Sequence, residues 1–478
     1  MDNFFHGARA KETKTPVSSP IVAASGIPFI VGTAPVQTVK TVPDGPVLCH
    51  SFAEAEAAFG YSDDWEKYSL CEAMYSSFKL FGVAPIILVN VLALATNKKT
   101  VEAAAKAVVN KQVRLPFEAI ASTVTVTGDS GTPTYVLDTD YKLFYDNDNL
   151  IVEVLAGGDA AEASSLQIGY DEVDTSTITK ADIIGGTDAE THVSTGLDLV
   201  DACYPKFLVA PDLILAPGWS HESDVAAAMA VKAESINGGM FRAHALIDAD
   251  CSTVTHYSGV SAWKETACIN SASQIVFWPQ VKFGGKQYHL SVQAAGVMAQ
   301  TDARNGSPYE SPSNKRIKAE AIVLADGTEV LLDLTQANTL NAAGVCTVQN
   351  TFGGPVLWGN YTAAYPGEDV KDIFIPVNRM FAWISKTLIL STLSKVDRPM
   401  TRRLVDSIAD SANIWLNGLV ADEQLLGGRV EVLDDENPLE DLMQGKIKYH
   451  VYIAPPAPAQ EVTFTVSYDV ESAGALLA

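Results

Sequence analysis

The sequence holds few residues whose types and spacing could support catalysis. His221 and Glu222 are adjacent, but the H-E-x-x-H spacing that places two zinc ligands on one face of a helix is absent. Gly259 and Ser261 match only half of a G-x-S-x-G nucleophile elbow, because the second glycine is missing. The G-x-x-x-x-G-K-S/T and G-x-G-x-x-G loops that bind nucleotides are absent as well. We therefore predict a solvated helix start at His221, no catalytic serine at Ser261 and no cofactor.

Metal binding is not predicted either. Four aspartates cluster in the sequence, but they lack the glycine and the terminal glutamate of an EF-hand loop, and solvated β-turns are the favoured interpretation. These residues are Asp138, Asp140, Asp146 and Asp148. The cysteines form no C-x-x-C pair, which predicts reduced, buried thiols rather than disulfides or a zinc site. They are Cys49, Cys71, Cys203, Cys251, Cys268 and Cys346.

Size and charge indicate an ordinary folded protein of several domains. The 478 residues are 47% hydrophobic and 19% charged, which predicts about two to four domains with large cores. The net charge of −24 argues against binding nucleic acid or an anionic membrane, both of which need a cationic surface. The most apolar run, residues 84–95, is too short to span a bilayer and predicts a buried strand. No secretory signal is visible at the amino terminus, so we expect the protein to be made and kept in a cytoplasm until lysis.

Residues 446–478 predict a strand followed by a detached arm. Residues 446–453 alternate between apolar and polar, and the prolines of residues 455–458 then favour an extended backbone. Residues 461–470 alternate again, and no glycine turn folds this second strand onto the first. Two interpretations remain open: a hairpin with a longer loop, or a strand donated to the sheet of a neighbouring subunit. The apolar side of the arm carries Val462, Phe464, Val466, Tyr468 and Val470.

The rest of the chain predicts an α/β protein with an insertion. Helices are expected at residues 52–59 and 68–81, before the buried strand at 84–95. Short strand-like segments separated by turn sequences then predict an all-β insertion over about residues 116–179. Strands separated by helices then indicate a mostly parallel sheet, which we interpret as scaffold. The strands are expected at residues 212–216, 241–247 and 274–278, and the helices at 224–235, 254–266 and 290–302.

The last third predicts two long helices and a strand. The first helix is expected over residues 377–396, and the second is expected to open at Arg398–Pro399 and to end near Gly418. A strand follows at residues 428–433. Six basic residues and one acid lie between positions 379 and 403, whereas eight acids and one base lie between positions 422 and 441. These are either solvated faces or patches that complement each other between copies of the chain.

In its motifs the chain resembles the sheath proteins of contractile phage tails and related tailocins. The resemblance covers nearly the whole chain except the β insertion, and it depends on the order of the motifs rather than on any single one. The segments that carry it are Phe5-His6-Gly7-Ala8, residues 51–82, 213–218 (LILAPG), 276–279 (VFWP), 311–314 (SPSN), 340–345 (LNAAGV), 354–356, 357–362 (LWGNYT), Arg398–Pro399 and 445–447 (GKI).

The resemblance implies a structural protein rather than an enzyme. It implies stacked hexameric rings around an inner tail tube protein, joined through both terminal arms, with baseplate and tail terminator proteins as further partners. It also implies contraction that drives the tube through a target envelope without nucleotide, in a virion tail or tailocin particle assembled in the bacterial cytoplasm. Direct contact with nucleic acid and insertion into a membrane are not expected.

In such proteins a helix of the inner domain faces the tube, and the predicted second helix matches it with Arg402, Arg403, Asp406 and Asp410. The alternative is that both arginines pair with the acidic segment at residues 422–441.

Together these observations predict an α/β and α+β multidomain fold. Its parts are an inner domain built from both chain ends, a middle α/β domain, an inserted outer β domain and two arms. The boundaries are residues 1–20 for the amino-terminal arm, 21–112 and 346–455 for the inner domain, 113–180 for the outer domain, 181–345 for the middle domain, and 456–478 for the carboxyl-terminal arm. The competing hypotheses are an α/β enzyme with an unrecognised site and another self-assembling capsid or adhesin subunit.

Overall fold

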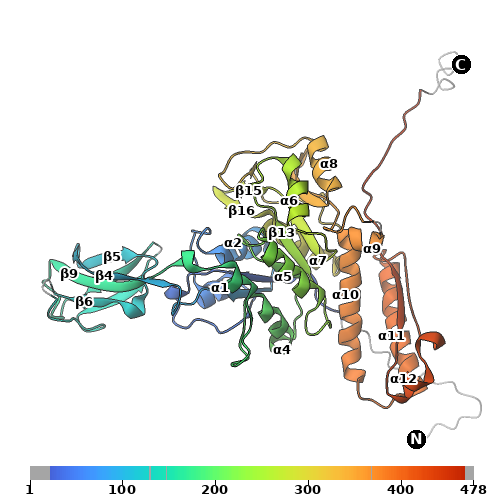
Figure 1. Ribbon diagram of the computed structural model, residues 1–478, viewed down its shortest axis with the longest axis horizontal. Coiled ribbons are helices and arrows are strands. Elements are labelled where there is room, and N and C mark those ends of the chain that lie inside the picture. Colours follow the sequence, from blue (N-terminus) through green and yellow to red (C-terminus); the bar gives the residue numbers. More distant parts are fainter. Residues whose placement is uncertain (1–21, 129–130, 147, 368, 469–478) are drawn as a thin grey trace, which may run out of the picture.

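An eight-stranded sheet forms the centre of the computed structural model, which describes residues 22–128, 131–146, 148–367 and 369–468 (Figure 1). The strand order is β19-β18-β14-β13-β12-β1-β3-β2, with six parallel strands between two antiparallel edge strands. Aliphatic runs without alternation fit such strands, because both faces of the sheet are covered. The bounds are β1 (Pro28–Gly32), β2 (Val47–Cys49), β3 (Ile86–Asn90), β12 (Leu213–Leu215), β13 (His244–Asp248), β14 (Gln274–Phe277), β18 (Val345–Thr351) and β19 (Gly354–Trp358).

Helices cover both faces of this sheet and bury two apolar cores. One core contains side chains of α2 (Ser69–Tyr75) and α7 (Leu290–Asn305), and the other contains side chains of α5 (Ser223–Glu234), α6 (Val260–Thr266) and α8 (Leu334–Ala342). The predicted parallel sheet and its crossover helices are thus confirmed. Smaller elements are α1 (Phe52–Phe59), α3 (Lys180–Ile184), α4 (Cys203–Phe207), α9 (Val370–Ile373), and the strands β10 (Gly186–Thr187), β11 (Ser194–Thr195), β15 (Gln280–Phe283), β16 (Lys286–Tyr288) and β17 (Ala321–Val323).

The grouping of residues 21–112 with the carboxyl-terminal part in one inner domain is wrong at the level of the sheet. Strand β1 lies between β3 and β12, so the amino-terminal strands are part of the middle α/β sheet. The reason is burial: Phe29, Val31 and Ile87 are almost fully buried, and only the interior of a large sheet covers both faces of such runs. Among the described residues of this amino-terminal part, the segment near Ala23 reaches the carboxyl-terminal core.

The inserted β body projects from one end of the molecule (Figure 1) and consists of two three-stranded antiparallel sheets around its own core. Its strands are β4 (Lys98–Ala107), β5 (Gln112–Pro116), β6 (Thr125–Thr127), β7 (Tyr141–Tyr145), β8 (Asn149–Val154) and β9 (Ser165–Val173). The predicted start at residue 113 is wrong, because β4 pairs with β9 from Lys98, opposite Val173. The alanines, lysines and glutamate of β4 give little strand signal, and pairing with β9 overrides that weak preference.

The carboxyl-terminal part packs two helices on a two-stranded ribbon. Helices α10 (Ile375–Thr392) and α11 (Arg402–Ala421) cover β20 (Gly427–Glu431) and β21 (His450–Ala454), and α12 (Leu439–Met443) lies between the strands in sequence. The predicted start of the second helix at Arg398–Pro399 is wrong. Thr401 caps α11 instead, accepting a hydrogen bond from the backbone N–H of Leu404 at 3.3 Å. No helix in the described part of the chain is long and apolar enough to cross a membrane.

Candidate functional site

The carboxyl-terminal arm has no strand partner within the described residues. It leaves β21 through Pro455, passes Tyr361 of the body at residues 458–461 and then runs away from the rest of the molecule (Figure 1). Four of the five predicted contact residues are described, and their apolar side chains face solvent. The exposed fractions are 67% for Val462, 85% for Phe464, 91% for Val466 and 82% for Tyr468. Val470 lies outside the described residues. A local hairpin with β21 is therefore not the structure of residues 461–468.

The β20–β21 ribbon has one closed edge and one free edge. Val430 of β20 pairs with Val451 of β21, yet both backbone groups of Val430 bond to the side chain of Asn413 on α11. The N–H of Val430 donates to Asn413 Oδ1 at 2.7 Å, and its C=O accepts from Asn413 Nδ2 at 2.9 Å. Since these groups point away from β21, the pair is of the non-hydrogen-bonded type. Helix α11 therefore closes the outer edge of β20.

The same geometry leaves the outer edge of β21 open. In a non-hydrogen-bonded antiparallel pair, the N–H and C=O of both residues point outward, so those of Val451 point away from β20. Alternation gives the backbone groups of Tyr449 and Ile453 the same direction. No other strand of the described chain pairs with β21 at this edge. An unpaired edge with a half-buried apolar face is a template for an added strand.

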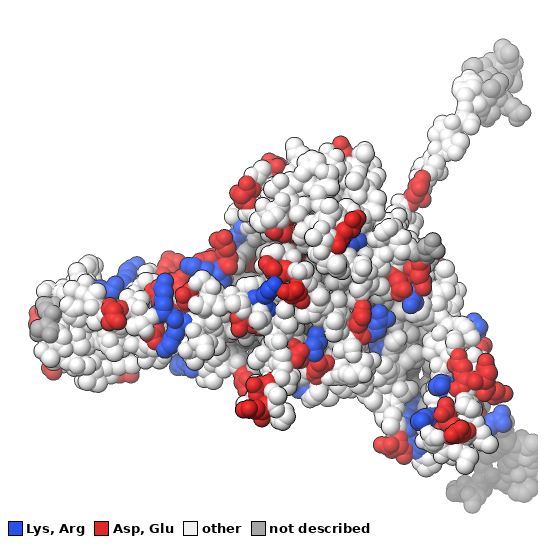
Figure 2. Space-filling view, viewed as in Figure 1, with Lys and Arg blue, Asp and Glu red and all other residues white. Residues whose placement is uncertain are grey.

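The predicted polar face of α11 is exposed. Arg402, Arg403, Asp406 and Asp410 all face solvent, and the only ion pair among them in the described chain joins Arg402 Nε to Asp406 Oδ2 at 3.8 Å. None of the ion pairs in the described residues joins either arginine to residues 422–441, so the structure gives no support to that alternative within one subunit. Figure 2 shows both signs of charge close together at the end of the molecule that holds α11 and α12.

The predicted basic patch at residues 379–403 is smaller than the sequence indicates. Arg379 is buried and pairs with Asp302 of α7, whose carboxylate also accepts from Ser25 Oγ at 2.6 Å. Lys386 is buried and pairs with Asp212, the residue before β12. These two cations therefore attach α10 to the α/β body instead of forming part of a surface. Sequence reasoning missed both pairs, because the acidic partners lie far away in the chain.

The candidate catalytic and metal-binding residues do not assemble into a site. Ser261 donates to Glu265 on its own helix at 3.4 Å, and His221 forms a contact with the neighbouring Glu222, at 3.7 Å, just before α5. Asp146 accepts from two backbone N–H groups of its own turn, as predicted. Within the described residues no three His, Cys, Asp or Glu side chains are placed to hold a metal ion. The cysteines are free thiols, and all except the exposed Cys268 are buried.

A crevice lies beyond the carboxyl ends of β1 and β12, where the strand order reverses and α/β proteins commonly bind ligands. The sequence indicated only scaffold in this sheet, yet the crevice contains a Glu72–His289 pair. The Glu72 carboxylate accepts from the backbone N–H of His289 at 2.6 Å and contacts its Nδ1 at 2.7 Å. Asp248 likewise accepts from the N–H of Ser291 at 2.9 Å. The amino terminus of α7 is therefore already bound by two carboxylates of the chain itself.

Comparison with known proteins gives matches along the whole chain. No protein-family model matches it. The chain is 27% identical over 477 residues to the tail sheath protein of Burkholderia phage BcepMu, covering 97% of this chain and 96% of that protein. It is 26% identical over 306 residues to the tail sheath protein of Escherichia phage P2, covering 62% of this chain and 72% of that protein.

Among solved structures, the sheath complex of the extracellular contractile injection system PVC in its contracted state has the same fold. That match has a TM-score of 0.57 and 13% identity over 99% of both chains. The resemblance noted from the motifs is confirmed.

Proposed function

We infer that this protein, a homologue of tail sheath proteins along nearly its whole length, is the structural sheath subunit of a contractile tail or injection machine. The observation that carries this conclusion is the 27% identity to a tail sheath protein, which extends over 97% of this chain and 96% of that protein. The shared fold of a contractile sheath complex supports it independently of close sequence identity.

The subunits would polymerise as stacked hexameric rings around an inner tube, joined by their arms. The exposed apolar face of residues 461–468 and the free edge of β21 are the two halves of such a contact. A strand added to β21 gains backbone hydrogen bonds that depend little on side-chain shape. The prolines at the start of the arm limit its slack, so rigid bodies can rotate while the added strand stays paired.

Contraction would then need no nucleotide, since the free energy is stored when the extended lattice forms and is released when its interfaces repack. The partners we propose are further copies of the chain, the tube protein, the baseplate and the tail terminator. The setting we propose is a virion tail or a related particle assembled in the bacterial cytoplasm. On the side facing the tube we place α11, because Arg402, Arg403, Asp406 and Asp410 stay exposed and offer breakable charged contacts.

Deleting residues 460–478 tests the assembly contact. The deleted segment contributes no buried side chain among its described residues, so the monomer should keep its fold by circular dichroism. High-speed sedimentation and negative-stain microscopy should show loss of polymers. The matched control is Thr463→Ala and Thr465→Ala on the polar side of the arm, which should still assemble. Polymers formed by the truncated chain would contradict the proposed role of the arm.

A further inference from the structure

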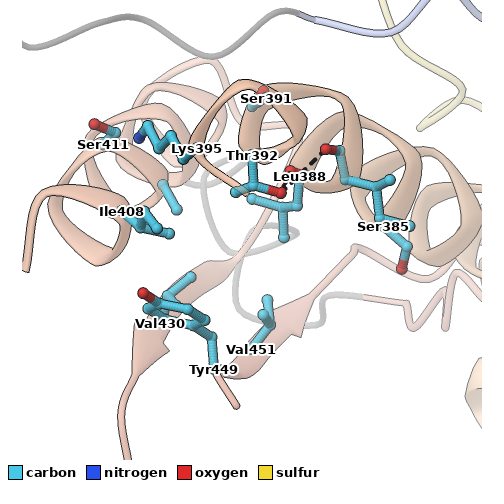
Figure 3. A pocket seen from close by; sticks show the side chains of 12 residues that line it. Ser385, Leu388, Ser391, Thr392, Lys395, Ile408, Ser411, Val430, Tyr449 and Val451 are labelled. Atoms are coloured by element: carbon cyan, nitrogen blue, oxygen red, sulfur yellow. Dashed lines mark hydrogen bonds between the residues drawn. The ribbon is translucent and has the colours of Figure 1, made fainter. Parts of the chain in front are cut away.

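A cavity of about 310 Å³ lies between helices α10 and α11 and the β20–β21 ribbon (Figure 3). The side chains of Leu388, Ile408, Val430, Tyr449 and Val451 point into it from all three elements. An apolar cavity of about 150 Å³ is large enough to take up benzene. The space between the helices and the ribbon is therefore sufficient for one aromatic side chain and part of a neighbouring one.

The serine and threonine hydroxyls that line the cavity already donate hydrogen bonds within their own helices. The hydroxyls of Ser385, Ser391, Thr392 and Ser411 each donate to a backbone carbonyl one turn earlier on their own helix, at 2.7–2.9 Å. These residues consequently turn methyl and methylene groups, rather than free donors, toward the cavity. An apolar occupant suits such a lining, because it brings no polar group that would lose its hydrogen bonds to water.

The cavity is continuous with the free edge of β21. Val451 and Tyr449 line the cavity, and the same two residues direct their backbone N–H and C=O groups outward along that edge. A strand added there lies about 4.8 Å from β21 and sets its inward side chains about 5 Å from those of Val451 and Tyr449. An added strand thus places one of its apolar residues at the cavity.

We propose that Phe464 from the arm of a second copy of this chain fills the cavity and anchors the added strand. This inference rests on the proposed strand addition and names the residue that fixes its register. Phe464 is 85% exposed in its own subunit and is the largest side chain of the arm without a polar group. Tyr468 would bring a hydroxyl into a cavity whose own hydroxyls are occupied. The amino-terminal residues 1–21 lack the alternation of an added strand, since Phe4 and Phe5 are adjacent.

Charge at the cavity favours the same occupant. Residues 461–478 contain three acids and no lysine or arginine: Glu461, Asp469 and Glu471. Lys395 lines the cavity, where burial and the neighbouring Arg398 lower the pKa of its amine. A nearby carboxylate from an incoming arm relieves this repulsion between two cations.

The first test compares assembly of full-length variants. Phe464→Ala should raise the protein concentration needed for sedimenting polymer by about 10- to 100-fold, the equivalent of losing one buried aromatic side chain. Phe464→Leu should restore most of the loss, and Thr465→Ala, on the polar side, should behave as wild type. Wild-type assembly of Phe464→Ala together with no assembly of the chain lacking residues 460–478 would overturn this inference and leave strand addition intact. Assembly of the truncated chain would instead count against the proposed function.

The second test locates the side chain, in a Cys268→Ser background that removes the exposed thiol. Phe464→Cys chains are mixed with Ser411→Cys chains and oxidised, so that a disulfide between positions 464 and 411 can form only between two copies. We expect a covalent dimer on non-reducing denaturing gels, at least about tenfold more abundant than with Thr465→Cys chains. Equal yields from positions 464 and 465, or no dimer in samples that have polymerised, would overturn the placement of Phe464 in the cavity.

Discussion

Replacing Arg379 with methionine should lower the free energy of unfolding by about 3–5 kcal/mol. The side chains of Arg379 and Asp302 are 3% and 0% exposed, and the guanidinium contacts both carboxylate oxygens. Removing one partner of a buried pair leaves an uncompensated charge, and such changes typically cost about 3–5 kcal/mol. This loss of unfolding free energy should exceed the loss caused by breaking an exposed ion pair. Lys142→Met, which breaks a contact to the part-exposed Glu153, should cost below about 1 kcal/mol.

Chemical denaturation of the full chain under non-assembling conditions provides the measurement. The ring centroids of Trp383 on α10 and Trp415 on α11 lie 5.5 Å apart. Their fluorescence therefore reports on the region that the Arg379–Asp302 pair attaches to the α/β body. The double variant Arg379→Met, Asp302→Leu should recover most of the lost stability, because no unpaired buried charge then remains at this position.

The dependence on pH separates this explanation from a simple loss of packing. Burial raises the pKa of Asp302 even with Arg379 beside it, so in the single variant the carboxyl should titrate well above its unfolded value of about 3.9. A raised folded pKa means that the destabilisation grows as the pH rises and shrinks as the pH falls. A deficit of less than 1 kcal/mol, or a larger deficit that stays constant with pH, would refute the reasoning.

Three further outcomes are expected. Deleting the inserted β body and joining the chain at its paired ends, residues 98 and 173, should preserve polymers on sedimentation, although some apolar contacts with the α/β body are lost. A deletion variant that folds but cannot polymerise would show that the insertion is part of the lattice. Although burial lowers the pKa of His289, the Glu72 carboxylate outweighs burial and raises that pKa to about 9. The stability that the His289–Glu72 pair contributes is therefore complete below a pH of about 6.5 and is lost as the pH rises through about 9. Glu72→Gln should remove this fall of the unfolding free energy between pH of about 6.5 and 9. An unchanged pH dependence would contradict the role of Glu72. Reversing Arg402 and Arg403 to glutamate should prevent sheath from forming on preassembled tube and spare tube-free polymers, whereas loss of both would assign the arginines to contacts between sheath subunits.

Local patterns predicted the elements whose burial is decided by their own residues. The run His244–Asp248 and the run Gln274–Phe277 formed parallel strands because their aliphatic side chains can be covered on both faces only inside a sheet. The alternation of residues 461–468 predicted a strand-like arm, and the structure leaves it without a strand partner among the described residues of its own subunit. These features needed no knowledge of the rest of the chain.

Features decided by distant residues could not be predicted. Lys98–Ala107 is a strand because Ser165–Val173 pairs with it, against a composition with little strand preference. The basic residue Arg379 became part of the core because Asp302, 77 positions earlier, meets it there. Which edge of the ribbon stays free depends on one side chain, Asn413, whose amide takes the place of a strand at β20. The sequence contains each residue, but only the fold brings the partners together.

The crevice beyond β1 and β12 shows how an α/β sheet that could bind a ligand can instead have a purely structural role. In ligand-binding relatives of this architecture, the amino terminus of a helix beside the crevice offers its N–H groups and positive dipole end to an anion. Here Glu72 and Asp248 occupy the first N–H groups of α7, and Glu72 and Asp248 lie on different elements of the body. Glu72 joins α7 to helix α2, and Asp248 joins it to strand β13, through charge-assisted hydrogen bonds, which are stronger than neutral ones. The groups that could recruit a ligand thus cross-link the body instead.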